Sequence, residues 1–129
     1  MAEPDAKSDR KRERRARYKR GLRSESWAAL WLRLKGYHIL ARRHKTPLGE
    51  IDIIARKRGK VSFIEVKQRN SIEAAHSAIP KRQQQRIARA ALYWLGQNKK
   101  YESDEMSLDV ILMVPMKMPV HIKGAFEPD

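Results

Sequence analysis

The stretch of sequence that decides the fold is residues 49–67, GEIDIIARKRGKVSFIEVK. Two runs with alternating apolar residues flank Lys57-Arg58-Gly59-Lys60, a turn-forming segment. This pattern predicts a β-hairpin with strands over about Glu50–Arg56 and Val61–Lys67. The apolar residues of both strands should share one buried face, because a slip of one residue would turn every side chain over. These residues are Ile51, Ile53, Ala55, Ile64 and Val66.

The hairpin register predicts a compact charged site. A loop of two or four residues places Asp52 across from Glu65, Ile54 across from Phe63, and Glu50 across from Lys67. Like charges on directly opposed strand positions are destabilising. A divalent cation between Asp52 and Glu65 removes that cost, and carboxylate oxygens are the ligands of Mg²⁺, with Mn²⁺ as the alternative ion. Lys67 lies on the same face as Glu65.

A second interpretation of the same residues stays open. An exposed hairpin face with diagonal salt bridges is common and contributes little stability. Short Glu-x-Lys strings are abundant in any charged protein, so spacing alone does not separate this interpretation from a metal site.

The rest of the chain predicts an α/β domain. A helix is expected over Leu22–Lys35, a strand over Tyr37–Arg42 and a second helix from Pro80 to Gly96, with loops over 68–79 and 98–106. Leu108, Val110, Leu112 and Val114 alternate as a further strand, and 119–123 is a candidate edge strand. The order is helix, three strands, helix, strand, which predicts a mixed sheet flanked by helices.

The first predicted helix is apolar on two sides. Trp27, Leu30, Trp31 and Leu34 follow the spacing of one helix face. Ala28, Ala29 and Leu32 form a second stripe almost opposite, in line with Glu25. Such a helix is either buried twice or packs on the sheet and also meets a partner. We expect the tryptophans to serve the core or a dimer interface rather than base stacking.

The charge of the chain points to a polyanionic partner. The protein has 29 Lys+Arg against 15 Asp+Glu, a net charge of +14. Residues 1–20 contain nine basic and four acidic residues and few large apolar side chains, which predicts a flexible basic arm ahead of a domain over 21–129. The remaining +9 lies on the domain itself. We therefore expect nucleic acid as the partner, the alternative being a basic surface that only aids solubility.

Composition excludes several classes of protein. The absence of cysteine excludes a disulfide framework and a thiolate zinc site and fits a reducing compartment. The start of the chain has no apolar signal region, and the longest apolar stretch, residues 110–116, is too short to span a membrane. We expect a cytoplasmic protein with no membrane partner.

Several motifs resemble the YraN-like family of uncharacterised bacterial proteins. Residues 49–54 and 63–69 resemble the family's GEIDLIA and FVEVKxR blocks, which are specific when they occur together. Further segments are similar to the family's first helix, second helix, late strand and closing motif, namely residues 25–37, 86–91, 109–110 and 125–126. The resemblance covers nearly everything from Gly21 to Phe126.

This resemblance implies a restriction-endonuclease-like core close to archaeal Holliday-junction resolvases. It makes Asp52 and Glu65 metal ligands, Lys67 the catalytic lysine, and Glu25 a helix carboxylate that reaches the same site. A homodimer is the expectation by analogy with resolvases. Because the family's activity is itself largely inferred from its fold, the resemblance does not establish cleavage.

The sequence departs from the family pattern where substrate contacts are expected. The family's Asn-x-Arg appears as Arg43 and Lys45, and its helix lysine falls at Gln83. We expect nucleic-acid contacts from basic and polar residues beside the site and at the start of the second helix, where backbone N–H groups also favour phosphate. These are Arg69, Lys81, Arg82, Gln83, Arg86 and Arg89.

The sequence thus supports a Mg²⁺-dependent endonuclease acting on branched or otherwise structured DNA. One rival is a non-catalytic DNA-binding module with a nuclease-like fold. The other is a protein–protein adaptor that uses the two-sided first helix. Asp109, on a strand apolar on both faces, is expected to be a buried structural carboxylate.

Overall fold

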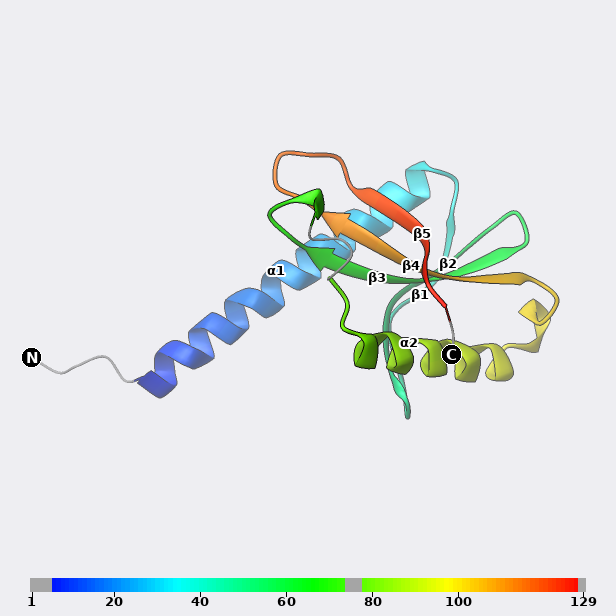
Figure 1. Cartoon of the computed structure of the whole chain (residues 1–129), viewed down its shortest axis with the longest axis horizontal. Coiled ribbons are helices and arrows are strands. Elements are labelled where there is room, and N and C mark those ends of the chain that lie inside the picture. Colours follow the sequence, from blue (N-terminus) through cyan, green and yellow to red (C-terminus); the bar gives the residue numbers. More distant parts are fainter. Residues whose placement is uncertain (1–5, 74–77, 128–129) are drawn as a thin grey trace, which may run out of the picture.

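The computed structural model describes residues 6–73 and 78–127 and shows two helices on a five-stranded sheet. The elements are α1 (Ala6–Leu34), β1 (His38–Thr46), β2 (Gly49–Lys57), β3 (Lys60–Gln68), α2 (Lys81–Gln97), the short 3-10 helix η2 (Lys99–Tyr101), β4 (Glu105–Met113) and β5 (Val120–Phe126). The strand order is β1-β2-β3-β4-β5, with β3 and β4 parallel and the other neighbours antiparallel. This is the α/β arrangement predicted for a restriction-endonuclease-like core (Figure 1).

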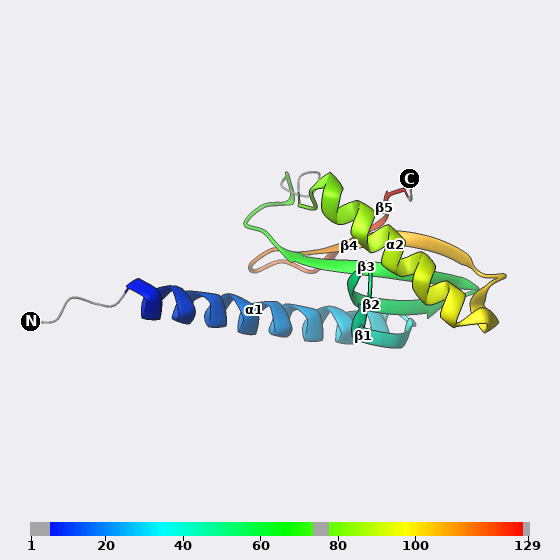
Figure 2. The same cartoon turned by 90° about the horizontal axis from the view of Figure 1, so that it is seen from below.

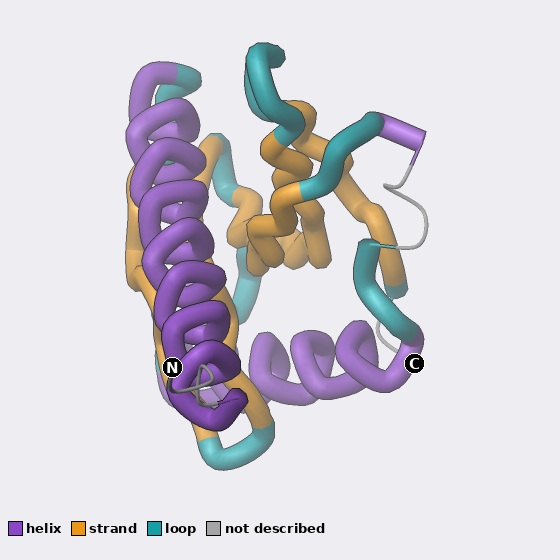
Figure 3. The backbone as a smooth tube through the Cα atoms, turned by 90° about the vertical axis from the view of Figure 1, so that its left-hand side faces the viewer, coloured by secondary structure: helices purple, strands orange, loops and turns teal. Residues whose placement is uncertain are grey.

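The two helices cover different faces of the sheet (Figures 2 and 3). On one face, Ala28, Ala29 and Leu32 of α1 pack with Ile53 and Ile64. On the other face, α2 packs through a larger cluster with residues of β2, β3 and β4 at its centre. Both faces of the central strands are therefore buried, which is why the parallel partner β4 is apolar on both sides.

The prediction of one buried face on the hairpin is only partly right. Ile53, Ala55 and Ile64 pack under α1, with Val66 against them, as expected. Ile51 instead joins the cluster under α2, together with Ile54 and Phe63 from the face expected to be polar. The physical reason is that helices cover both sides of the sheet, so a buried strand position need not alternate with a polar one.

Helix α1 begins earlier than predicted. Residues 6–20 form its first turns, and every side chain from 6 to 21 is exposed. Ala, Lys, Arg and Glu are strong helix formers, and a helix that is packed at its C-terminal end extends without a new nucleation step. The helix thus replaces the unstructured arm predicted for these residues and projects away from the sheet (Figure 1). Residues 1–5 lie outside the described residues, and a single domain over 21–129 stays a prediction.

The C-terminal half of α1 uses the small-residue stripe for packing. Ala28, Ala29 and Leu32 are fully buried, whereas Trp27 is 64% exposed and Leu34 78% exposed. The helix ends where Gly36 takes a left-handed conformation, φ 91°, and the Tyr37 N–H donates to the Leu32 carbonyl. One of the two predicted apolar faces therefore meets the sheet, and of the other face only Trp31 packs against the core while Trp27, Leu30 and Leu34 are exposed. No helix among the described residues has the length and apolar content to cross a membrane.

The β2–β3 hairpin has the predicted register. Ile54 pairs with Phe63 and Lys57 with Lys60, so the loop contains only Arg58 and Gly59. Both loop residues have positive φ, 51° and 75°, as in the type I′ turn that suits the twist of a hairpin. The paired ladder ends at Ile53–Ile64, so the expected backbone pairs Asp52–Glu65 and Glu50–Lys67 do not form.

Candidate active site

The site lies at the open end of the β2–β3 hairpin, where the ladder stops. Beyond Ile53 the backbone partner of the Val66 N–H is replaced by the Asp52 carboxylate, whose Oδ2 accepts this hydrogen bond at 2.9 Å. A side chain that takes the place of a ladder carbonyl satisfies the N–H and lets the two strands separate. This separation leaves space for side chains between β2 and β3, which a continuous ladder of backbone hydrogen bonds would not.

Asp52 and Glu65 meet in this space. Asp52 is half-buried and Glu65 is buried, and both line one cavity. Burial and the nearby charge of Asp52 raise the pKa of Glu65 to about 8. Burial also raises the pKa of Asp52, against the lowering effect of the Val66 N–H and of Lys67. The site therefore disfavours two ionised carboxylates side by side, and a bound cation would offset that cost.

Lys67 lies beside Glu65, as the sequence predicted. Its Nζ is 3.5 Å from Glu65 Oε1, and about a quarter of its side chain is exposed. Gln83, from the start of α2, donates a hydrogen bond from Nε2 to the same oxygen at 3.1 Å. Gln83 was expected to contact nucleic acid, and the structure places it on the carboxylate pair instead.

Glu25 of α1 lines the same cavity of about 270 Å³ as Asp52, Glu65 and Lys67. Its oxygens are engaged by two guanidinium groups: Oε1 is 3.2 Å from Arg42 Nε, and Oε2 is 3.7 Å from Arg43 Nε. Burial raises the pKa of Glu25, and the hydrogen bond from Arg42 acts in the opposite direction. The structure thus brings Glu25 to the predicted place but gives it cationic partners from β1.

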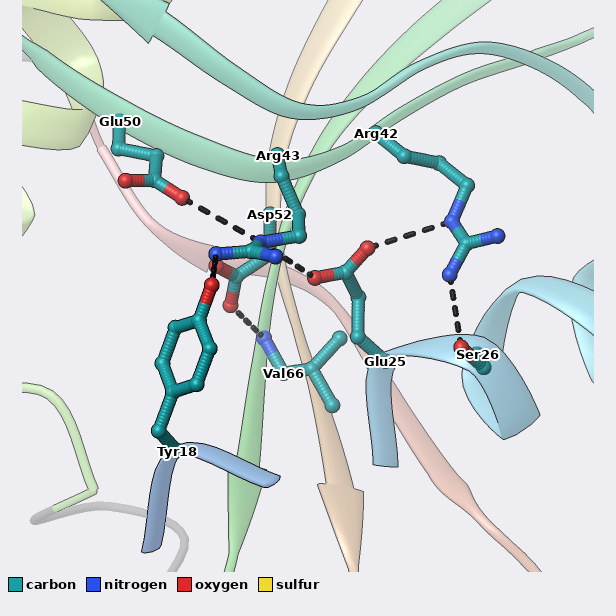
Figure 4. A network of polar contacts seen from close by, with 8 residues as sticks. All are labelled: Tyr18, Glu25, Ser26, Arg42, Arg43, Glu50, Asp52 and Val66. Atoms are coloured by element: carbon teal, nitrogen blue, oxygen red, sulfur yellow. Dashed lines mark hydrogen bonds and ion pairs between the residues drawn. The ribbon is translucent and has the colours of Figure 1, made fainter. Parts of the chain in front are cut away.

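The two arginines of β1 are the part of the site that sequence reasoning missed. Arg43 lies between the paired positions Arg42–Ile53 and His44–Ile51, with a positive φ of 48° that is unusual for a residue other than glycine. Its guanidinium donates to the Tyr18 hydroxyl at 2.7 Å and lies 3.9 Å from Glu50 (Figure 4). The only sequence signal was that Arg43 stands where the family pattern has another residue.

The other predicted nucleic-acid contacts lie around this site. Lys81, Arg82, Arg86 and Arg89 are exposed along α2, whose N-terminal end reaches the site through Gln83. Arg69 is half-buried and donates to two backbone carbonyls, of Gln68 at 2.6 Å and of Ala78 at 2.9 Å. Its positive charge has no carboxylate partner among the described residues and remains available to an anion.

Comparison with known proteins identifies the family. Residues 24–113 match the sequence profile of the family described as "Uncharacterised protein family UPF0102". The chain belongs to this family. The YraN-like resemblance predicted from residues 49–69 is thereby confirmed, since UPF0102 is the YraN family.

Relatives match almost the whole chain. A UPF0102 protein of Bradyrhizobium diazoefficiens is 43% identical, with 98% of each chain covered. A UPF0102 protein of Rhodopseudomonas palustris is 48% identical over 89% of this chain and 88% of its own length. One from Bartonella bacilliformis is 46% identical over 91% of this chain and 96% of its own. The family is thus established, and the function has to be argued from the site.

Proposed function

We propose that this UPF0102 protein is a Mg²⁺-dependent endonuclease that hydrolyses phosphodiester bonds in branched or otherwise structured DNA. The observation that carries the proposal is that half-buried Asp52 and buried Glu65 line one cavity with Lys67, whose Nζ is 3.5 Å from Glu65 Oε1. The net charge of +14 supports a polyanionic substrate. The choice of structured DNA rests on the resemblance to resolvases.

The donor set fits a hard divalent cation. Asp52 and Glu65 supply oxygen ligands, and the raised pKa of each carboxyl group reflects a site that stabilises their negative charge incompletely. Among the described residues, no set of three His, Cys, Asp or Glu side chains lies close enough together to hold a metal. Two carboxylates nevertheless suffice for Mg²⁺, which usually keeps several waters and takes further oxygens from substrate phosphate.

Each protein group has a defined task in this proposal. The Val66 N–H holds the Asp52 carboxylate in place, and Gln83 does the same for Glu65. The Lys67 ammonium stabilises negative charge that develops on the phosphate under attack. Glu25 fixes the guanidinium of Arg43 beside the carboxylates, where it can bind a neighbouring phosphate. When bound, Mg²⁺ supplies Lewis-acid polarisation of the phosphodiester and a more acidic water.

The test is a cleavage assay on duplex, flap and four-way-junction DNA with Mg²⁺ or Mn²⁺. We expect Asp52→Asn, Glu65→Gln and Lys67→Met each to lower the cleavage rate about 100-fold or more, because each removes a charge that acts on the transition state. Glu102→Gln is the matched control, since Glu102 is exposed at the C-terminal end of η2 and does not line the active-site cavity. A Glu65→Gln variant as active as the wild type would refute the assigned site.

The same assay separates the two rivals. A DNA-binding module without turnover would show affinity for junction DNA that Asp52→Asn and Mg²⁺ leave unchanged, with no cleavage of any substrate. A protein–protein adaptor would show no DNA affinity that falls steeply as salt rises, whereas a phosphate binder must show it.

A further inference from the structure

A groove beside the candidate active site combines an exposed indole with arginines. It has a volume of about 750 Å³, and its charged lining residues are Arg20, Arg23 and Arg69, with no carboxylate among the lining residues. Trp27 and the apolar Met113 and Val114 form part of its walls. The size falls in the roughly 300–1,000 Å³ range of sites that bind small organic ligands, the size class of a nucleotide.

The groove continues directly from the active-site cavity. On α1, Tyr18, Leu22 and Glu25 line the cavity, while their neighbours Arg20, Arg23 and Trp27 line the groove. On the other side, Glu65–Lys67 at the end of β3 line the cavity, and the next three residues, 68–70, line the groove. The groove therefore begins where the cavity ends along β3. A nucleic-acid strand bound at the carboxylate pair and running along β3 would enter the groove at residues 68–70.

Trp27 has no structural task that explains its position. Its side chain is 64% exposed, and the described residues give it no aromatic or cationic partner, unlike Trp31 and Trp94. It also lines a second hollow of about 340 Å³ together with Leu22, Ser26 and Leu30. An indole that borders two hollows has its flat surface open to a ligand.

The charges around Trp27 are also unused by the fold. Arg20 and Arg23 are exposed, and in the part of the chain that the structure describes neither forms an ion pair or hydrogen bond. Arg69 is pinned to two backbone carbonyls, so its guanidinium is held at the groove wall without charge neutralisation. A flat apolar platform with flanking cations is the combination that binds single-stranded nucleic acid, by stacking a base and tracking its phosphates.

We propose that this groove binds an unpaired nucleotide segment, with a base stacked on Trp27 and its phosphates on Arg20, Arg23 and Arg69. The inference rests on the proposed function for its biological role, because it defines the preferred DNA as one with a single-stranded arm next to the scissile bond. The exposure of Trp27 is at odds with a place in the core, and a dimer interface at this face remains the alternative prediction. Binding itself needs neither a metal nor cleavage.

The experiment measures binding in EDTA, so that cleavage plays no part. Fluorescence anisotropy gives the affinity for a blunt duplex, for the same duplex with a single-stranded arm, and for oligo(dT) and oligo(U) of equal phosphate number. We expect wild type to prefer the armed duplex, and Trp27→Ala to bind the armed duplex and the single strands about ten-fold or more weakly while duplex affinity stays within two-fold. Trp27→Phe keeps an aromatic surface and should retain most of the preference. The two single strands tell whether DNA or RNA is the better ligand.

Matched variants on the same helix control for nonspecific loss. Leu34→Ala removes an apolar side chain of similar exposure outside the groove, and Arg33→Ala removes an exposed charge outside it. Arg23→Ala should weaken all nucleic acids and lower the slope of log affinity against log salt, whereas Leu34→Ala should change nothing. If Arg33→Ala and Arg23→Ala weakened nucleic-acid binding equally, the arginines would act only through the general positive charge of the protein. That result would overturn their assignment to the groove.

Two results would overturn the proposal as a whole. One is a Trp27→Ala variant with the wild-type preference for the armed duplex. The other is a Trp27→Ala variant that changes the oligomeric state in light scattering, which would make this face a protein interface. The outcome is separate from that of the endonuclease proposal, because Asp52→Asn should retain the preference for the arm. Loss of cleavage without loss of arm binding, or the reverse, tells which of the two proposals fails.

Discussion

Two carboxylate sites on neighbouring strands, Asp109 of β4 and the Asp52–Glu65 pair of β2 and β3, differ in how many hydrogen-bond donors the protein gives them. Asp109, on β4, is fully buried and accepts hydrogen bonds from Ser107, from His121 at 2.7 Å and from the Gly124 N–H at 3.0 Å. Burial alone would raise the pKa of Asp109, but these donors outweigh it and lower the pKa below its ordinary value.

The Asp52–Glu65 pair, in which Asp52 is half-buried and Glu65 is buried, has fewer donors. Asp52 has one backbone donor, and Glu65 has Gln83 and a lysine 3.5 Å away. Burial raises both pKa values, and the charge of Asp52 adds to the rise for Glu65, whose pKa reaches about 8. The difference teaches that burial does not define a functional carboxylate. Asp109 receives its donors from the fold, whereas the Asp52–Glu65 pair, which we propose to bind a cation, does not receive a full set.

The largest difference between the two sites should appear in stability. We expect Asp109→Ala to lower the free energy of unfolding by about 3–5 kcal/mol, because it leaves Ser107 and His121 without their hydrogen-bond acceptor. Asp52→Asn should leave stability unchanged or raise it, since it removes a repulsive charge. Urea unfolding followed by circular dichroism measures both. Equal losses for the two variants would break the comparison.

Mg²⁺ should raise the free energy of unfolding by binding at the Asp52–Glu65 pair and not at Asp109. At a concentration 100 times its dissociation constant, a ligand that binds the folded state alone adds about 2.7 kcal/mol. We expect such a rise with MgCl₂ for the wild type at pH 8, and no rise for Glu65→Gln beyond that given by an equal ionic strength of NaCl. An Asp109→Asn variant, if folded, should keep the response. A Mg²⁺ effect that survives Glu65→Gln would place the ion elsewhere.

The metal-free protein should lose stability as pH rises. The folded pKa of Glu65 is about 8, above its ordinary 4.5, so between these values the folded state binds more protons than the unfolded state. The contribution of Glu65 to the free energy of unfolding is therefore most favourable below pH 4.5. It falls toward pH 8 by up to about 1.4 kcal/mol per pH unit. Chemical unfolding in EDTA from pH 5 to 8 measures the slope. Glu65→Gln should flatten it, and Glu102→Gln should not.

The smallest effect is expected from Gln83. Gln83→Lys places an ammonium near Glu65 Oε1, now 3.1 Å from Gln83 Nε2, and so favours the ionised carboxylate. The fall in stability between pH 5 and 8 should become shallower, by about 1 kcal/mol in total, with Gln83→Met as the uncharged control. A slope identical in Gln83→Lys and Gln83→Met would show that α2 does not act on the pair.

Local sequence determined the elements and the hairpin register. The alternation of apolar residues, the Arg58-Gly59 turn and the apolar strand around Asp109 depend on neighbours within a few positions, and such patterns are visible in sequence. From them followed the α/β order, the Ile54–Phe63 pair and the approach of Asp52 to Glu65. The helical start of α1 was missed because its charge density was taken as a sign of disorder, although its residues are strong helix formers.

Only the tertiary structure decided which groups meet across the chain. Glu25 finds Arg42 seventeen residues away, and Glu65 finds Gln83 eighteen residues away. The burial of Ala28 rather than Trp27 depends on which side of α1 packs on the sheet. Periodicity marks which side chains share a face, but which face is covered and which donor reaches a carboxylate are set by packing between distant segments, which no local pattern encodes.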